Sequence, residues 1–310
     1  MSSPRTFRFG VIHRTAPSRA EWQERARRAE DLGYDTFLVS DHFLEHFAMG
    51  PALTSAAEAA SRIRVGSMVY DSDFRHPVVL AKEAASIDLL TDGRFELGLG
   101  AGWMLSDYEQ SGISFDPPPV RFQRFAETLE VLKGLFAEGP FTFRGRYFTI
   151  EGLEGLPKPK QRPRMPIVVG AGGPRMLRLA AREADVISIL VQSLPAGGLS
   201  FAEVTSASFD DKLRLIRETA GERYAKLEIS LLMQQTAVTD DRQRAADEIG
   251  RMWNTPPEAV LDCPLAVIGS VDHIVDELQA RRDRWDASYV CVFAQAMETF
   301  APVVSRLAGR

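Results

Sequence analysis

The stretch PVVLAKEAASIDLLTDGRFELGLG, residues 77–100, decides the fold. Its first part predicts a helix that starts at Pro77, since proline is favoured in the first helical turn. A turn then leads into the continuous apolar run at 95–100, which predicts a buried strand. Short apolar strands that alternate with helices are typical of a parallel sheet covered on both faces. The stretch therefore predicts one helix–strand unit of an α/β protein.

The same alternation continues in both directions. Strands are expected at 7–12, 35–40, 64–70, 95–100, 166–170, 185–190, 227–238 and 288–293, with helices at 18–32, 52–61, 77–90, 121–138, 174–183, 241–253, 271–284 and 300–307. Residues 101–120, with three consecutive prolines, predict a long loop, and 141–150 predict a hairpin. Eight strands favour a (β/α)8 TIM barrel with insertions after strand four and before strand five. The barrel is expected to form one domain over 1–310, and an open doubly wound sheet is the alternative.

Composition narrows the class of protein. The chain has 310 residues, 45% of them hydrophobic, and a net charge of −5. Two cysteines, Cys263 and Cys291, exclude a disulfide scaffold, and no Cys/His cluster predicts a metal site. No apolar run approaches the roughly 20 residues that cross a bilayer. The N-terminal residues hold no signal-peptide pattern, so we expect a cytoplasmic protein. The lack of a long apolar run argues against a membrane as partner, and the negative net charge argues against nucleic acid.

Polar and glycine residues recur where the predicted strands end. In a parallel barrel the active site lies at these carboxyl ends. The residues there are His13, Ser40, Asp41 and His42, Tyr70, Asp71 and Ser72, Gly98 to Trp103, and Gly170 to Gly173. This recurrence predicts an enzyme that acts on a small molecule.

Asp41 and His42 form the sharpest candidate pair. A histidine can pass a proton near neutral pH, and an adjacent carboxylate can orient or charge it. The alternative is an aspartate that caps the next turn beside a bystander histidine. Zinc is not expected, because His46 is the only other nearby nitrogen ligand. Asp107 and Glu109, in the predicted loop, are interpreted as solvated rather than substrate-facing.

Two glycine-rich segments are candidates for cofactor contact. Gly170-Ala171-Gly172-Gly173-Pro174-Arg175 stands between a strand and a helix, where free N–H groups bind phosphate; a tight turn that merely needs glycine is the alternative. Gly98, Gly100 and Gly102 are a poor match to a dinucleotide motif and are interpreted as giving a ring system room. Trp103 either walls such a site or packs under the loop.

Taken together, these segments resemble the bacterial-luciferase-like monooxygenase superfamily, in particular its deazaflavin (coenzyme F420) oxidoreductases. The matching stretches are SDHF (40–43), HPVVLAKEAASIDLLTDGRFELGLGAGW (76–103), YEQSGISF (108–115), RFQRFAETLEVLKGLF (121–136), FRGRYF (143–148), MPIVVGAGGPRMLRLAAREADVISI (165–189) and VIGSVDHIVDEL (267–278). They cover nearly the whole chain in the order of the predicted barrel.

The resemblance implies a TIM barrel that holds a flavin or deazaflavin at its C-terminal mouth. It implies that His42 and Asp41 stand beside the reactive ring as catalytic residues, and that a non-prolyl cis peptide around 70–72 props the ring. The cofactor-binding residues so implied are His13, Asp41, Tyr70, Asp71, Ser72, Gly100, Ala101, Gly102, Gly170, Ala171, Gly172, Gly173 and Arg175, the loop at 171–175 taking the phosphate. A homodimer formed through barrel helices is also implied.

The expected function is hydride transfer between reduced F420 and an unidentified organic substrate. The alternatives are a two-component monooxygenase that uses FMN, and a flavin-binding paralogue without activity. The DHF and GLGAGW blocks favour the deazaflavin, and 31 arginines against 6 lysines suit the GC-rich genomes in which it is common. Two positions depart from the resemblance. Trp103 replaces a glutamate of the sugar-phosphate dehydrogenase branch, and Met104 replaces an asparagine of some flavin-using relatives.

Overall fold

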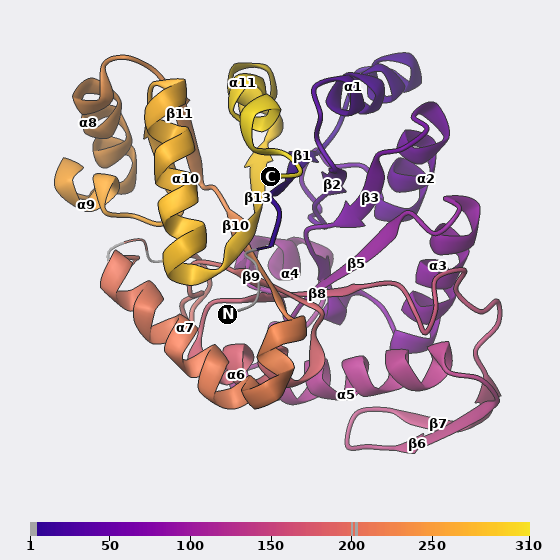
Figure 1. The fold of residues 1–310 in the computed structure, drawn as a ribbon. Helices are drawn as coiled ribbons and strands as arrows, with labels where there is room; N and C mark the ends of the chain where they lie inside the picture. The colour runs from indigo at the N-terminus through magenta and orange to yellow at the C-terminus, as the bar shows by residue number, and fades with distance from the viewer. Residues whose placement is uncertain (1–4, 200, 202–203) are drawn as a thin grey trace.

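Eight parallel strands close into a barrel in the computed structural model, which describes residues 5–199, 201 and 204–310. The strands are β1 (Arg8–His13), β2 (Thr36–Val39), β3 (Arg64–Ser67), β5 (Phe95–Gly100), β8 (Ile167–Ala171), β9 (Val186–Ile189), β10 (Glu228–Leu232) and β13 (Ala287–Phe293) (Figure 1). β1 pairs with β13 and β3 with β5, and the short β4 (Tyr70–Asp71) pairs with the end of β5. The predicted (β/α)8 TIM barrel is therefore confirmed and the open sheet is excluded.

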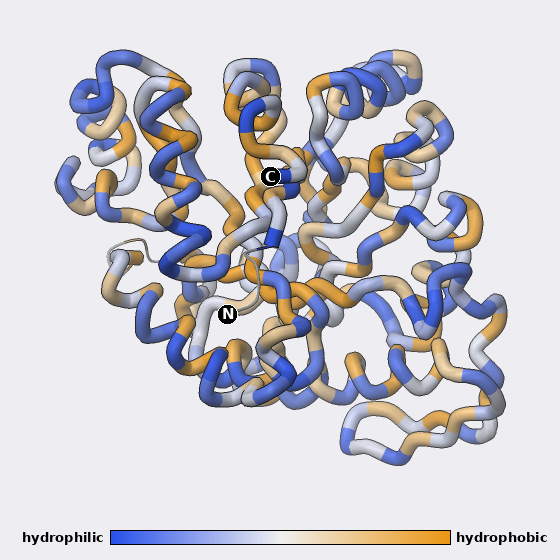
Figure 2. The backbone as a smooth tube through the Cα atoms, viewed as in Figure 1, coloured by the Kyte–Doolittle hydropathy of each residue, from blue (hydrophilic) through white to orange (hydrophobic). Residues whose placement is uncertain are grey.

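Strand residues alternate between two cores. In β1, Phe9 and Val11 face the surrounding helices and belong to the large outer core. Ile12 faces inward and packs with seven other buried residues inside the barrel: Leu38, Met68, Val168, Val186, Leu232, Tyr289 and Cys291. The strands are largely hydrophobic apart from charged residues near their starts, such as Arg8, Arg64 and Glu96, whereas the helices carry mixed residues (Figure 2). Even-numbered residues of β1 thus point into the barrel.

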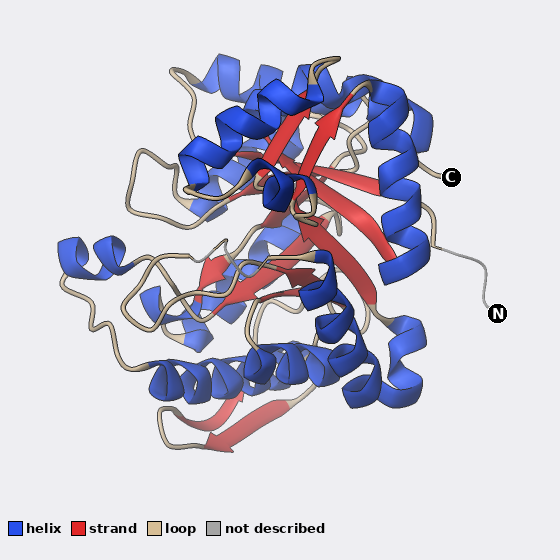
Figure 3. Ribbon diagram, turned by 90° about the vertical axis from the view of Figure 1, so that its left-hand side faces the viewer, coloured by secondary structure: helices blue, strands red, loops and turns tan. Residues whose placement is uncertain are grey.

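Helices surround the strands (Figure 3). They are α1 (Arg19–Asp31), α2 (Met49–Ala59), α3 (Pro77–Leu90), α5 (Pro118–Phe136), α6 (Pro174–Glu183), α7 (Ser206–Ala220), α8 (Arg242–Trp253), α9 (Pro257–Leu261), α10 (Val271–Trp285) and α11 (Met297–Leu307), with short 3-10 turns at η1 (Ser72–Phe74), η2 (Gly221–Lys226) and η3 (Ala294–Ala296). Of the helices described, none is both long and apolar enough to span a membrane.

The insertions differ in part from expectation. Residues 101–120 are not one loop, because α4 (Leu105–Ser111) forms there and ends at Gly112, whose φ is 74°. The predicted hairpin is confirmed as β6 (Pro140–Arg144) and β7 (Thr149–Glu154). The single strand expected at 227–238 is two strands. β10 belongs to the barrel, while β11 (Gln235–Val238) leaves it to pair with β12 (Ala266–Gly269).

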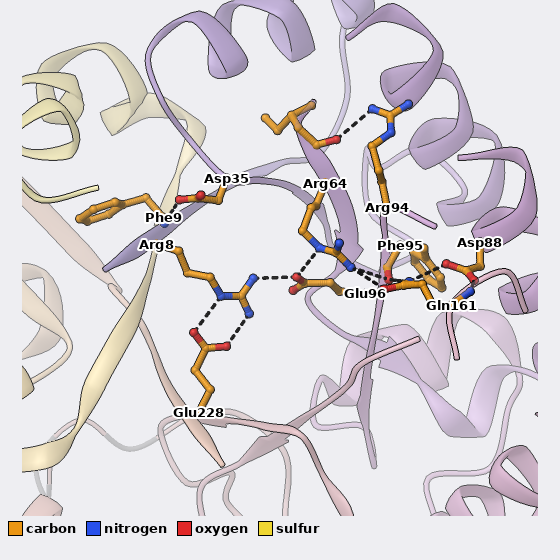
Figure 4. A network of polar contacts seen from close by, with 11 residues as sticks. Arg8, Phe9, Asp35, Arg64, Asp88, Arg94, Phe95, Glu96, Gln161 and Glu228 are labelled. Atoms are coloured by element: carbon orange, nitrogen blue, oxygen red, sulfur yellow. Dashed lines mark hydrogen bonds and ion pairs between the residues drawn. The ribbon is translucent and has the colours of Figure 1, made fainter. Parts of the chain in front are cut away.

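A partly buried ionic network lies at the N-terminal end of the barrel, around the buried carboxylate of Glu96 (Figure 4). Glu96 Oε1 accepts from Arg8 Nη1 at 2.6 Å and from Arg64 Nε at 2.8 Å. Arg8 also donates to both carboxylate oxygens of Glu228, at 2.8 and 2.7 Å. Burial alone would raise the pKa of Glu96, but the two guanidinium groups outweigh it and hold that pKa below its ordinary value. Because these side chains fill the N-terminal end of the barrel, a ligand site is expected at the opposite end, where the strands finish.

Candidate active site

A cavity of about 370 Å³ opens at the carboxyl ends of the barrel strands. Most of the predicted site residues line it: Asp41, His42, Asp71, Gly100, Ala101, Gly102, Gly170, Gly172 and Gly173. Trp103 and Met104 form part of its wall, together with apolar residues from other strand ends, among them Met68, Leu232 and Phe293. The barrel thus gathers into one chamber groups that are far apart in the sequence.

His42 is held by Asp107. The Nδ1 atom of His42 lies 2.6 Å from Asp107 Oδ2, and the backbone N–H of Phe43 donates to Oδ1 of the same carboxylate at 3.2 Å. The Asp107 side chain is only 3% exposed, so its interpretation as solvated is wrong. The ring of Trp103 stands edge-on to His42, with centroids 5.8 Å apart. Because Nδ1 is occupied, Nε2 is the nitrogen left to act on a ligand.

Asp41 is not the partner of its neighbour His42. Its carboxylate forms two contacts with Arg75, at 2.6 and 3.1 Å, and accepts from the backbone N–H of Asp71 at 3.0 Å. The expectation that Asp41 orients or charges His42 is therefore corrected. Asp41 instead fixes the chain that follows β4 to the cavity wall.

Asp71 is a buried carboxyl group at the cavity wall. It accepts from the Tyr108 hydroxyl at 2.8 Å and from the backbone N–H of Asp73 at 2.9 Å. Burial, joined by the negative charges of Asp73 and Asp41, raises the pKa of Asp71 to about 7. Near neutral pH this side chain can hold or release a proton.

His13 lies outside the cavity, contrary to its prediction as a cofactor ligand. As an odd-numbered residue of β1 it points toward the helices, where its ring stacks on Phe37 with centroids 4.4 Å apart. Among the described residues, neither ring nitrogen finds a hydrogen-bond partner. Burial, with the charge of Arg25, lowers its pKa to about 3, so the ring is neutral. His13 is a packing residue.

Four other predicted residues also lie away from the cavity. Tyr70 points outward and its hydroxyl donates to Glu83 at 2.9 Å. Ser72 is buried in η1, and Ala171 is buried in the outer core. Arg175 is exposed on α6, with its guanidinium 5.8 Å from the ring of Phe122. Tyr70 and Ala171 point away from the barrel axis because of their positions in the strands. Arg175 lies in the first turn of α6, next to Gly173, and its contact with a cofactor phosphate stays a prediction.

Two glycines of β5 make room for the end of β3 and for the chain that follows it. A Cβ atom on Gly98 would lie 1.9 Å from the carbonyl oxygen of Ser67, and one on Gly100 would lie 2.8 Å from Val69 Cγ2. The non-prolyl cis peptide in this segment is Met68–Val69, so its predicted position at 70–72 is wrong.

The loop between β8 and α6 offers an open backbone surface. A Cβ on Gly172 would lie 2.6 Å from the carbonyl oxygen of Val191, so this position requires glycine. A Cβ on Gly173 would make only ordinary contacts, the shortest 3.6 Å to Gln192. Gly173 precedes α6, whose first turn has no side-chain cap. Uncapped N–H groups at a helix start bind anions.

Some cavity residues were missed by the sequence interpretation. Arg14 lines the mouth one position after β1, and His46 lies beside His42, with ring centroids 5.4 Å apart. The alternation of β1 would have identified Arg14, because residues 8, 10, 12 and 14 share one face. Asp107 could not be found this way, since it is distant in sequence from His42. In the described part of the chain, no cluster of three or more His, Cys, Asp or Glu could hold a metal ion.

Comparison with known protein families gives one broad match, since the family described as luciferase-like monooxygenase matches residues 5–288. An F420-dependent glucose-6-phosphate dehydrogenase of Amycolatopsis mediterranei (strain U-32) is 32% identical over 170 residues, which are 52% of this chain and 50% of that protein. One of Nakamurella multipartita is 28% identical over 262 residues, covering 81% and 73% of the two chains. The chain thus spans about half the length of the first of these relatives.

Solved structures show the same fold at low sequence identity. An F420-dependent secondary alcohol dehydrogenase in complex with an F420-acetone adduct has a TM-score of 0.80 at 17% identity, covering 98% of this chain and 99% of that one. A coenzyme F420-dependent tetrahydromethanopterin reductase from Methanopyrus kandleri has a TM-score of 0.78 at 18% identity, with the same coverage.

Proposed function

Because this chain belongs to the luciferase-like monooxygenase family, we propose that it is an oxidoreductase that moves a hydride between coenzyme F420 and an organic substrate. The observation that carries the proposal is the His42–Asp107 pair, which faces a chamber with an uncapped helix start on its far side. The names of several relatives and structural neighbours, which are F420-dependent enzymes, support the choice of cofactor.

The cavity residues fit a deazaflavin. Gly172 and Gly173 would hold the phosphate against the first turn of α6, because the surface above Gly173 is open. The catalytic and ring-binding positions are proposed at His42, Asp41, Asp71, Gly100, Ala101, Gly102 and Gly170, which line the cavity. Bound reduced F420 supplies a hydride, and the protein supplies position and a proton.

His42 is proposed as the proton donor. When a carbon of a polarised double bond in the substrate gains a hydride, the atom bonded to it gains negative charge. His42 gives this atom a proton from Nε2, and in the reverse direction it removes one. Asp107 fixes the ring and stabilises the imidazolium, while Trp103 and the apolar wall keep water away. The substrate so gains two electrons and two hydrogens, one of them the proton from His42 Nε2.

A titration of the purified protein with F420 and with FMN tests the proposal. We expect saturable binding of F420 and turnover without oxygen. Tight binding of FMN with no binding of F420 would overturn it in favour of the two-component monooxygenase. Binding of F420 without turnover across a broad substrate panel would favour the inactive paralogue.

The domain organisation, the oligomeric state and the location of the protein are part of the proposal. Residues 1–310 are proposed to form one domain, because the outer core joins residues from Phe7 to Leu307. A homodimer through barrel helices and a cytoplasmic location stay predictions from the sequence. The oligomer is measurable by light scattering.

A further inference from the structure

Arg14 is a cation at the mouth of the cavity that has no charged partner in the described part of the chain. Among the described residues that line the cavity it is the only arginine or lysine. No hydrogen bond or ion pair within the described chain involves its guanidinium, whose contact is the ring of Phe293 at 5.2 Å. Other cavity-lining charges are already engaged: Asp41 binds Arg75 and Asp107 binds His42. The cavity therefore offers one free positive charge.

Arg14 stands on the same wall as the proposed proton donor. The backbone N–H of Phe47 donates to the Arg14 carbonyl oxygen at 2.8 Å, which ties the loop holding His42 and His46 to the end of β1. Burial, then His42 and then Arg14 lower the pKa of His46, consistent with the three groups lying close together. Because its lowered pKa keeps His46 neutral, the fixed positive charge on this wall is the Arg14 guanidinium.

The cofactor phosphate is proposed for the opposite side of the barrel. Around the closed sheet, β1 is followed by β2, β3, β5 and then β8, so the strands bearing Arg14 and Gly172 are four places apart in either direction. In a ring of eight strands this places them across the barrel from each other. An anion at Arg14 is therefore separate from the phosphate at Gly172 and Gly173.

We propose that the substrate carries a carboxylate, and that Arg14 binds it and so determines specificity. The inference rests on the proposed function. A guanidinium presents a planar pair of donors that matches the two oxygens of a carboxylate. One unpaired cation suits a monoanion better than the dianion of a phosphate ester. The apolar surface of Leu44, Leu232 and Phe293 would cover the rest of the substrate.

Binding of small probes tests the assignment without knowledge of the substrate. The probes are benzoate, 3-phenylpropanoate and 4-phenylbutanoate, each compared with its primary amide, and phenyl phosphate. They are titrated calorimetrically at low salt into the protein loaded with oxidised F420, which cannot reduce them. We expect at least one carboxylate to bind roughly tenfold or more tightly than its amide, as one charged hydrogen bond implies. This preference disappears in Arg14→Gln and is partly kept in Arg14→Lys.

Arg19→Gln is the matched control, because Arg19 is an exposed arginine of α1 that does not line the cavity. The proposal is overturned if no carboxylate is preferred, if the preference survives in Arg14→Gln, or if phenyl phosphate binds more tightly than every carboxylate. It is also overturned if Arg14→Gln weakens F420 as strongly as the probes, because Arg14 would then serve the cofactor. If the wild-type protein binds no F420, the proposed function fails, and the probe preference is still read on the unloaded protein.

Discussion

The 2.6 Å contact between His42 and Asp107 predicts a specific kinetic effect. Asp107→Asn keeps the shape but removes the charge that stabilises the imidazolium, and its amide favours the wrong tautomer. We expect a loss of turnover of roughly 10²–10⁴-fold, similar to that of His42→Ala, as for the loss of a general acid. The measurement is kcat as a function of pH at saturating F420, compared between the wild type and the two variants.

Glu109→Gln serves as the control, since Glu109 is an exposed residue of the same helix. An unchanged kcat and pH profile in Asp107→Asn would show that the carboxylate does not act through His42.

Gly173 offers a matched pair of substitutions. Gly173→Ala makes only ordinary contacts at 3.6 Å or more, so the fold and the affinity for F420 should stay close to wild type. Gly173→Asp places a carboxylate where a phosphate is proposed, and repulsion should weaken F420 at least tenfold in a fluorescence titration. Equal affinities of the two variants would place the phosphate elsewhere.

The raised pKa of Asp71, about 7, predicts a dependence of stability on pH. An unfolded aspartate titrates near pH 4, so the folded state binds a proton more tightly. Protonated Asp71 therefore adds to the free energy of unfolding. This contribution is largest below about pH 4 and is lost as the pH rises through 7. Asp71→Asn stays neutral, and Tyr108 can still donate to Asp73, 3.1 Å away.

Between pH 6 and 8 the free energy of unfolding should therefore fall by about 1 kcal/mol more in the wild type than in Asp71→Asn. Urea unfolding at the two pH values measures this difference. Parallel pH dependence of the two proteins would refute the raised pKa.

Among the elements, the turn of the β6–β7 hairpin is held to α5 by the side chain of Glu127. The Glu127 carboxylate of α5 accepts from the backbone N–H groups of Arg146, Tyr147 and Phe148, at 2.7, 2.9 and 3.2 Å. Glu127→Ala removes all three bonds and should speed hydrogen exchange at these amides, with a loss of stability of about 1–3 kcal/mol. The exposed Glu130→Ala on the same helix is the control. Unchanged exchange at the hairpin would contradict the assignment.

The elements also show what the sequence could and could not predict. All eight barrel strands were predictable, because a strand buried on both faces is a continuous apolar run. Helix α4 was missed, since it is short and lies in a segment rich in proline and glycine. The partner of His42 was missed with it. Adjacent residues such as Asp41 and His42 point in different directions, and periodicity gives no information on contacts between distant segments.

At the scale of the whole molecule, the ionic network at the N-terminal end of the barrel links four strands, because it joins the starts of β1, β3, β5 and β10 (Figure 4). Glu96→Gln would leave the guanidinium groups of Arg8 and Arg64 without their shared carboxylate. Because Arg8 keeps Glu228 and both arginines are partly exposed, we expect a cost below that of breaking a fully buried pair from one side, which is about 3–5 kcal/mol. Since the pKa of Glu96 is lowered, its stabilising contribution is present at neutral pH and is lost as the pH falls through that pKa.

Chemical unfolding at pH 7 measures the cost. Glu24→Gln, which breaks an exposed ion pair with Arg27 on α1, is the control and should change stability by less than about 1 kcal/mol. If the two variants lost similar amounts of unfolding free energy, the ionic network would stabilise the protein no more than an exposed ion pair does.

The pairing of β1 with β13 bears on how the protein is made. A ribosome releases β1 first, yet the strand that covers one of its edges begins only at Ala287. At a synthesis rate of roughly 5–20 residues per second, that edge stays unpaired for on the order of 15–55 s before β13 is made. Throughout translation the nascent barrel presents an open, apolar strand edge of the kind that pairs with other chains. Slow synthesis should therefore favour aggregation of this protein, and a chaperone that shields nascent chains should favour its yield.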